Sequence, residues 1–140
     1  MTFRTDATAV EITAAGAQLL ASYDSFAVAR GSEGSIAVLQ AHGRYAEPVA
    51  RASELQFAAG TIDVTALSAQ SGPWSVDSDG MAVGVIHLVA PIKAAWQGEL
   101  ASREISLLRY VPQNGFVVRG RLSDLLGASA VPYVDWVGPY

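Results

Sequence analysis

Residues 105–120 read ISLLRYVPQNGFVVRG, and this stretch decides the fold. Two runs rich in β-branched and aromatic residues, Ile105–Tyr110 and Phe116–Gly120, flank the turn sequence Pro112–Gly115. Such residues favour strands, and Gly115 can adopt the positive φ of a tight turn. The stretch therefore predicts two antiparallel strands joined by a hairpin.

The segment before this hairpin predicts a strand and a helix. Met81–Val89 is a β-branched run typical of a central strand. Pro91 can then open a helix in its first turn. That helix carries an apolar stripe at a spacing of four residues, which predicts that one side of it faces a sheet: Ile92, Trp96 and Leu100.

The segment after the hairpin predicts a second helix and a final strand. Ser123 can cap a short leucine-rich helix, and Val131–Tyr140 reads as the last strand. The order is therefore strand, helix, strand, strand, helix, strand. This is the ferredoxin-like, or split βαβ, pattern.

A fainter version of this order occupies the first part of the chain. Its opening strand is reduced to Thr2–Arg4, and Ser35 is the predicted cap of a helix that ends at Gly43. Further elements are predicted at Ala7–Ala15 (helix), and at Ala17–Tyr23, Phe26–Arg30, Leu55–Phe57 and Ile62–Val64 (strands).

We therefore expect an α+β chain of two tandem ferredoxin-like (βαββαβ) units with antiparallel sheets, the first of them degenerate. The first repeat spans residues 1–67 and the second spans residues 81–140. Residues 68–80 are rich in Ser, Gly, Pro and Asp and are the predicted linker.

Both helices of such a unit lie on one face of the sheet, which leaves the other face bare. Because side chains alternate between the two faces of a strand, one face of the predicted hairpin carries Leu108, Tyr110, Phe116 and Val118. The other face carries Leu107, Arg109 and Val117. Both sets hold more apolar residues than a solvated face requires. Either the two repeats pack together, or a partner covers the sheet.

Composition excludes several classes of protein. The net charge of −4 and the scattered arginines argue against a nucleic-acid surface. The longest apolar run, Met81–Ile92, is interrupted by Gly84 and His87 and is too short to span a bilayer, so no membrane partner is expected. Cysteine is absent, so neither disulfides nor a thiolate metal site can form.

Catalytic and metal-binding patterns are also absent. No Gly-x-Ser-x-Gly nucleophile motif occurs, and His42 and His87 have no second nitrogen or sulfur ligand nearby in the sequence. We expect structural roles for both histidines. Asp77–Gly80 lacks the later acidic ligands of a calcium loop and reads as a polar turn. The sequence predicts a chain that is not an enzyme and holds no metal or cofactor.

Three segments together resemble the N-terminal pro-region of bacterial subtilisin-like (subtilase) serine proteases. Ala90–Trp96 matches a P-x-x-x-x-W helix, and Ile105–Gly120 matches a Y-[IV]-P-x-N-x-[FY]-x-V hairpin. Val134–Tyr140 matches the closing motif V-x-W-V-G-P-Y. Ala15–Phe26 and Leu55–Val64 resemble the segment that precedes this region.

The resemblance implies a folding chaperone and inhibitor of a subtilisin-like catalytic domain, in cis or in trans. It implies a secreted protein, although Met1–Asp6 is polar and shows no secretory signal. The chain is therefore either intracellular or a trimmed form with an added Met1, and we favour the second. A free-standing interaction module with the same fold is the alternative. A small-molecule enzyme would require a closed pocket lined by polar groups.

Residues of the hairpin and of the closing motif are the candidate protease-binding residues. In the family the closing extension lies in the substrate cleft as a product-like strand. Either Gly138–Tyr140 is this tail, or Val134–Val137 is simply the last strand of the sheet and Gly138–Tyr140 is a linker stub. The candidates are Tyr110, Phe116, Val118, Trp136, Val137, Gly138, Pro139 and Tyr140.

Overall fold

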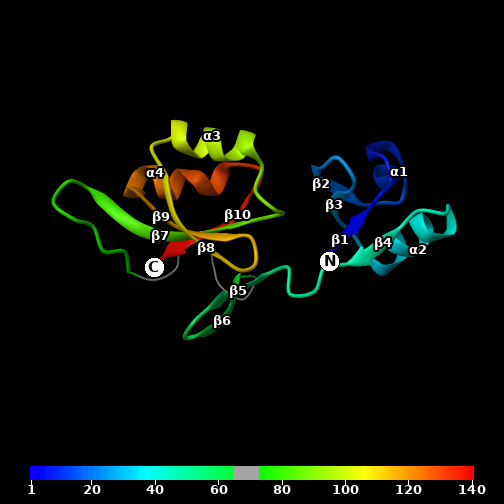
Figure 1. Ribbon diagram of the computed structural model, residues 1–140, viewed down its shortest axis with the longest axis horizontal. Helices are drawn as coiled ribbons and strands as arrows, with labels where there is room; N and C mark the ends of the chain where they lie inside the picture. Colours follow the sequence, from blue (N-terminus) through cyan, green and yellow to red (C-terminus); the bar gives the residue numbers. More distant parts are fainter. Residues whose placement is uncertain (65–72) are drawn as a thin grey trace. The chain divides into compact units, whose positions relative to one another are not determined.

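A computed structural model describes residues 1–64 and 73–140 and divides into two compact units (Figure 1). Unit 1 is Met1–Ala52 and unit 2 is Ser53–Tyr140. The described part of the chain is α+β, with antiparallel sheets and four α-helices, which confirms the predicted class. Residues 68–72 of the predicted linker lie outside the described residues.

Unit 1 builds one four-stranded antiparallel sheet with the strand order β2-β3-β1-β4. Its opening strand is complete rather than reduced, because all four residues of β1 pair with β3. The elements are β1 (Thr2–Thr5), α1 (Ala9–Ala14), β2 (Gln18–Ser22), β3 (Ala27–Arg30), α2 (Glu33–Ala41) and β4 (Ala46–Pro48). Pro48 lies on an edge strand, where a missing N–H is tolerated.

Helix α2 begins earlier than predicted. Its N-cap is Ser32, whose hydroxyl accepts from the Ser35 amide at 3.2 Å, so the prediction that Ser35 caps this helix is wrong. Ser35 instead completes the capping box and is buried. The helix ends at Ala41, and Gly43 follows with φ of +77°, which agrees with the predicted stop.

An ion pair connects α1 to the end of α2 in unit 1. The Nε of Arg44 lies 2.8 Å from Oε2 of Glu11, and Glu11 also belongs to the capping box of α1 with Thr8. The hydrogen bond from Arg44, followed by the bond from the Thr8 amide, lowers the pKa of Glu11 from 4.5 to about 2.

We predict that Arg44→Gln raises the pKa of Glu11 from about 2 toward 4.5. A lowered carboxyl pKa stabilises the fold above pH 4.5, and that contribution is lost as the pH falls toward 2. The destabilisation of unit 1 by Arg44→Gln should therefore be present at pH 7 and vanish near pH 2. An NMR titration of the Glu11 carboxyl measures the pKa, and an unchanged midpoint in the variant would contradict the assignment.

Unit 2 contains a second four-stranded antiparallel sheet, with the order β10-β7-β9-β8, and a separate two-stranded hairpin. The hairpin is β5 (Glu54–Phe57) and β6 (Gly60–Asp63). The sheet unit comprises β7 (Met81–Leu88), α3 (Ala94–Ser102), β8 (Ser106–Val111), β9 (Gly115–Arg121), α4 (Leu122–Gly127), a 3-10 turn (Ala128–Ala130) and β10 (Val134–Pro139). Helix α3 starts at Ala94 after its N-cap Lys93, three residues later than the predicted opening at Pro91.

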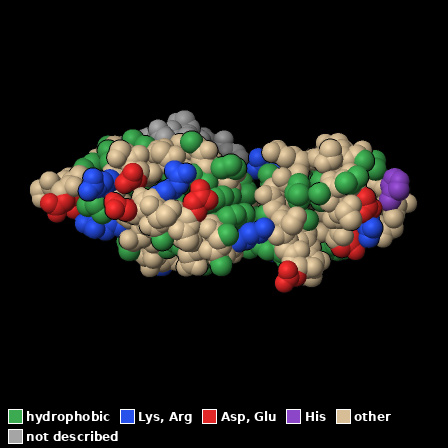
Figure 2. All heavy atoms as spheres, turned by 90° about the horizontal axis from the view of Figure 1, so that it is seen from above, with side chains coloured by type: hydrophobic (Ala, Val, Ile, Leu, Met, Phe, Trp, Pro, Cys, Tyr) green, Lys and Arg blue, Asp and Glu red, His purple; other side chains and the backbone are tan. Residues whose placement is uncertain are grey.

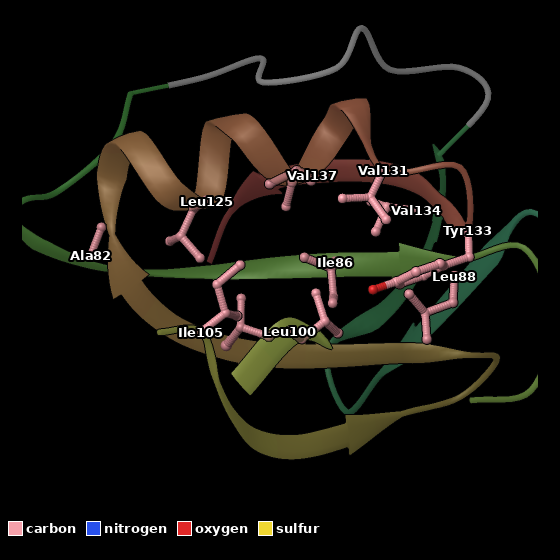
Figure 3. Packing of buried hydrophobic residues seen from close by; sticks show 12 residues of the cluster. Ala82, Ile86, Leu88, Leu100, Ile105, Leu125, Val131, Tyr133, Val134 and Val137 are labelled. Atoms are coloured by element: carbon pink, nitrogen blue, oxygen red, sulfur yellow. The ribbon is translucent and has the colours of Figure 1, made fainter. Parts of the chain in front are cut away.

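The main core of unit 2 lies between the sheet and its two helices. Helices α3 and α4 occupy one side of the sheet (Figure 1). Leu100 from α3, Leu125 from α4 and Ile86 from the central strand β7 are fully buried there and converge in Figure 3. Trp96 stacks on Tyr133 at 4.7 Å at the border of this core.

The β5–β6 hairpin covers part of the opposite face of the sheet (Figure 1). Its Leu55 is fully buried against Val85, Val117 and Trp136. A Cβ placed on Gly115 would lie 2.3 Å from Cδ2 of Leu55, so only glycine leaves room for this side chain. The predicted first repeat, residues 1–67, includes this hairpin, whereas the contacts group it with unit 2.

The turn between β8 and β9 uses Asn114 rather than Gly115 for its left-handed residue. Asn114 has φ of 59°, while Gly115 is the first residue of β9 and pairs with Val111. Asparagine tolerates this conformation better than most residues. The hairpin is therefore confirmed, and the predicted role of Gly115 in the turn is wrong.

A bulge in β8 changes which residues share a face. The pairing shifts between Leu107 and Arg109, so that Leu107 opposes Val118 and Arg109 opposes Val117. Leu108 is the inserted residue and is 54% exposed. The predicted set that joined Leu108 to Val118 is therefore wrong, and Leu107 takes its place on the helix side.

We predict that Leu55→Ala lowers the free energy of unfolding of unit 2 by about 2–5 kcal/mol, because it removes the buried contact of the hairpin. Ile62→Ala, on the neighbouring strand with 39% of the side chain exposed, is the control. It should cost about 1 kcal/mol or less. All three tryptophans lie in unit 2, so urea unfolding followed by tryptophan fluorescence reports on this unit. Equal losses would contradict the role of Leu55.

Candidate functional site

A groove of about 670 Å³ lies on the helix-free face of the sheet in unit 2, beside the β5–β6 hairpin. Its floor includes Val85 and the indole of Trp136, both nearly fully buried. Residues Phe57–Ile62 of the hairpin form one wall, and Arg109–Val111 of β8 contribute to the rim. A mostly apolar concavity of this size with a few polar groups is typical of a ligand site.

A contact between Arg109 and Tyr140 bridges the two edges of the sheet across this groove. Arg109, Val117, Val85 and Gly138 are successive partners in one row running from β8 to β10. A guanidinium nitrogen of Arg109 donates to the Tyr140 hydroxyl at 3.2 Å, and the guanidinium carbon lies 6.0 Å from the centre of the Tyr140 ring. The two side chains therefore meet above the two central strands.

The closing residues stay paired with the sheet to the end of the chain. Gly138 pairs with Val85 and Pro139 pairs with Gly84, so β10 includes two of the three residues of the candidate tail. The Tyr140 amide donates to the Val83 carbonyl at 3.3 Å. The Tyr140 side chain is 66% exposed.

The structure brings four of the eight candidate residues together at the groove. Tyr110, Trp136, Pro139 and Tyr140 line it, and Gly138 lies directly beneath the Trp136 indole.

The other three candidates lie on the helix side of the sheet. Phe116 is half-buried and meets the Tyr110 ring edge-on at 5.4 Å. Val118 and Val137 are fully buried in the main core. The side chains of these two valines pack the core and are enclosed by it.

A buried histidine lies beside the site. His87 is 1% exposed in the interior of β7, and its Nδ1 lies 3.0 Å from Oδ2 of Asp135. A bulge between Val134 and Trp136 places Asp135 there. Within residues 1–64 and 73–140, Nε2 of His87 has no hydrogen-bond partner. The carboxylate fixes the orientation of the ring.

The described residues contain no cluster of three or more His, Asp or Glu side chains that could hold a metal ion. No helix in the same part of the chain has the length and apolar character needed to cross a membrane. Figure 2, seen from the side on which α3 and α4 lie, shows acidic and basic side chains interspersed. That face carries no large patch of a single sign.

Residues 56–140 match a family described as a domain of unknown function, DUF8729. The chain belongs to the DUF8729 family. The matched region covers most of unit 2 and contains all the groove residues. No curated protein and no solved structure matches this DUF8729 chain.

Arg109 and the hairpin residues Phe57 and Ile62, which line this groove, are not among the candidate residues predicted from the sequence. The local pattern placed Arg109 on the same face as Val117, which the structure confirms. The docking of the hairpin on that face depends on a contact between segments about 60 residues apart, Leu55 and Gly115. The one sequence feature that indicates this docking is a glycine, Gly115, opposite the buried Leu55. It can be recognised only after the two segments are known to be in contact.

We predict that Gly138→Ala disturbs the floor of the groove. The added Cβ would lie 2.2 Å and 2.3 Å from ring carbons of Trp136, which forces the indole to move. The variant should lose about 1–3 kcal/mol of unfolding free energy and show a shifted tryptophan emission. Gly98→Ala is the control, because a Cβ there, in α3, meets nothing within 4 Å. It should stabilise by about 0.5–1 kcal/mol, and similar losses in both variants would exclude the proposed clash.

Proposed function

We propose that this chain is the non-catalytic pro-region of a secreted subtilisin-like serine protease, which assists the folding of the catalytic domain and inhibits it. The motifs at Ala90–Trp96, Ile105–Gly120 and Val134–Tyr140 support this proposal. They fall on three parts of unit 2: the loop before α3 with its first turn, the β8–β9 hairpin, and β10. The motif residues therefore lie in one structural unit.

We also propose that both units are ferredoxin-like. Unit 1, and unit 2 after its β5–β6 hairpin, have the order strand, helix, strand, strand, helix, strand. Each sheet has its fourth strand beside the first, followed by the third and the second, with all neighbours antiparallel. This shared arrangement supports the assignment of both units to the split βαβ pattern.

One observation carries the inhibitor proposal: Gly138–Tyr140 is already extended and ends in an exposed aromatic side chain. An extended segment can lie along a protease cleft, where its side chains enter pockets. Pro139 restricts the segment before binding, so less entropy is lost. Tyr140 then serves as the aromatic anchor.

An inhibition assay with the mature subtilisin-like protease encoded downstream in the same reading frame tests the function. The full chain should inhibit hydrolysis of a peptide substrate at micromolar concentration or below, and Tyr140→Ala should weaken inhibition about tenfold or more. Tyr45→Ala is the matched control, because Tyr45 is a half-exposed tyrosine of unit 1, and it should leave inhibition unchanged.

The outcomes separate the parts of the proposal. No inhibition at micromolar concentration would exclude the inhibitor role. Equal effects of the two tyrosine variants would exclude Tyr140 as the anchor. Refolding of the denatured catalytic domain with and without the chain tests the chaperone role independently, and unchanged recovery of activity would exclude it.

A free-standing interaction module is the second candidate function. The edge strand β8 supports it, since among the described strands of the sheet β8 pairs with β9 alone and exposes Leu108 and Tyr110, each at 54%. The reading frame after Tyr140 discriminates between the two candidates. A downstream Asp, His and Ser triad favours the pro-region, and a stop codon favours the module.

A further inference from the structure

The groove on the helix-free face of unit 2 has the composition of a site for an amphiphilic ligand. Most of its lining is apolar, and Arg109 is the only charged residue among the described residues that line it. The remaining polar side chains of the lining are few, namely Gln56, Thr61 and Tyr140, because the Tyr110 ring packs on Phe116 on the helix side. A ligand of matching chemistry has one anionic group and an otherwise apolar body.

The guanidinium of Arg109 is available to such an anion. Its described hydrogen bond goes to the Tyr140 hydroxyl, and no carboxylate is among the described residues that line the groove. A guanidinium has five N–H donors in a planar fork, which fits a carboxylate with two parallel bonds. The arginine therefore retains donors for a ligand carboxylate at the rim.

The apolar part of the groove can accept a hydrocarbon chain. The Trp136 indole and Val85 lie at its floor, and Phe57 and Ile62 lie along the hairpin wall. A volume of about 670 Å³ lies within the range of small-molecule sites. An extended peptide suits the groove less well, because each of its amides would need a polar partner and the lining offers few.

We propose that this groove binds a free monocarboxylate with a long apolar chain, of the fatty-acid class. The carboxylate pairs with Arg109 and the chain lies between the β5–β6 hairpin and the sheet. In the bound state the carboxylate competes with the Tyr140 hydroxyl for the guanidinium. The proposal is independent of the protease partner.

Binding of dodecanoate to the full chain tests this site by NMR. The indole N–H signal of Trp136 should shift on titration, whereas that of Trp96, which stacks on Tyr133 on the helix side, should not. Dodecanol, which has the same chain without the charge, should bind about tenfold or more weakly.

Two variants and one control test where the carboxylate and the hydrocarbon chain of the ligand bind. Arg109→Gln should weaken dodecanoate binding about tenfold or more and leave dodecanol binding unchanged. Ile62→Glu, at a partly exposed position of the wall, should weaken binding through repulsion of the carboxylate. Arg103→Gln, at the end of α3 and paired with Glu99, is the control and should bind as the wild type does.

Each of the following results would overturn the proposal. The first is the absence of any Trp136 shift with dodecanoate. The second is equal affinity for dodecanoate and dodecanol, or equal loss in Arg109→Gln and Arg103→Gln. The third is tighter binding of a short peptide that ends in leucine with a free carboxylate, which would assign the groove to a peptide instead.

Discussion

The contact between Leu55 and Gly115 is the constraint on which the rest of unit 2 depends. A four-stranded sheet with both helices on one side has a second apolar face, which must be covered. Leu55 inserts where Gly115 has no Cβ, and this places the β5–β6 hairpin on that face. The hairpin covers Val117 and part of Val85 and leaves the groove beside it. The groove is therefore the part of this sheet face that the hairpin does not cover.

Local sequence patterns predicted most helices and strands, because turn residues, helix caps and β-branched runs determine the backbone conformation of residues only a few positions away. The strand at Met81–Leu88 and the hairpin after α3 are examples. The predictions failed where a longer-range contact decides. The bulge at Leu108 reverses the alternation of β8, and Gly115 is a glycine because of Leu55 rather than because of its turn. Groove residues such as Phe57 could therefore not be predicted from sequence spacing.

The closing motif, Val134–Tyr140, contains both buried and exposed side chains. Val137 points into the main core, while Trp136 packs on the opposite face over Gly138. Asp135, Pro139 and Tyr140 remain accessible to another molecule, and Tyr140 is held by Arg109. A motif that reads as a single recognition signal in the sequence is, in the folded chain, a core strand that ends in a short accessible segment.

The position of Pro139 on an edge strand has a consequence for self-association. Tyr140 donates its amide inward to Val83, and amide directions alternate along a strand, so the nitrogen of Pro139 faces the open edge. That nitrogen carries no hydrogen, and the other edge of the sheet is interrupted by the bulge at Leu108. Neither edge offers an uninterrupted row of donors and acceptors to a second copy. The sheet is thereby protected against growing strand by strand into a polymer.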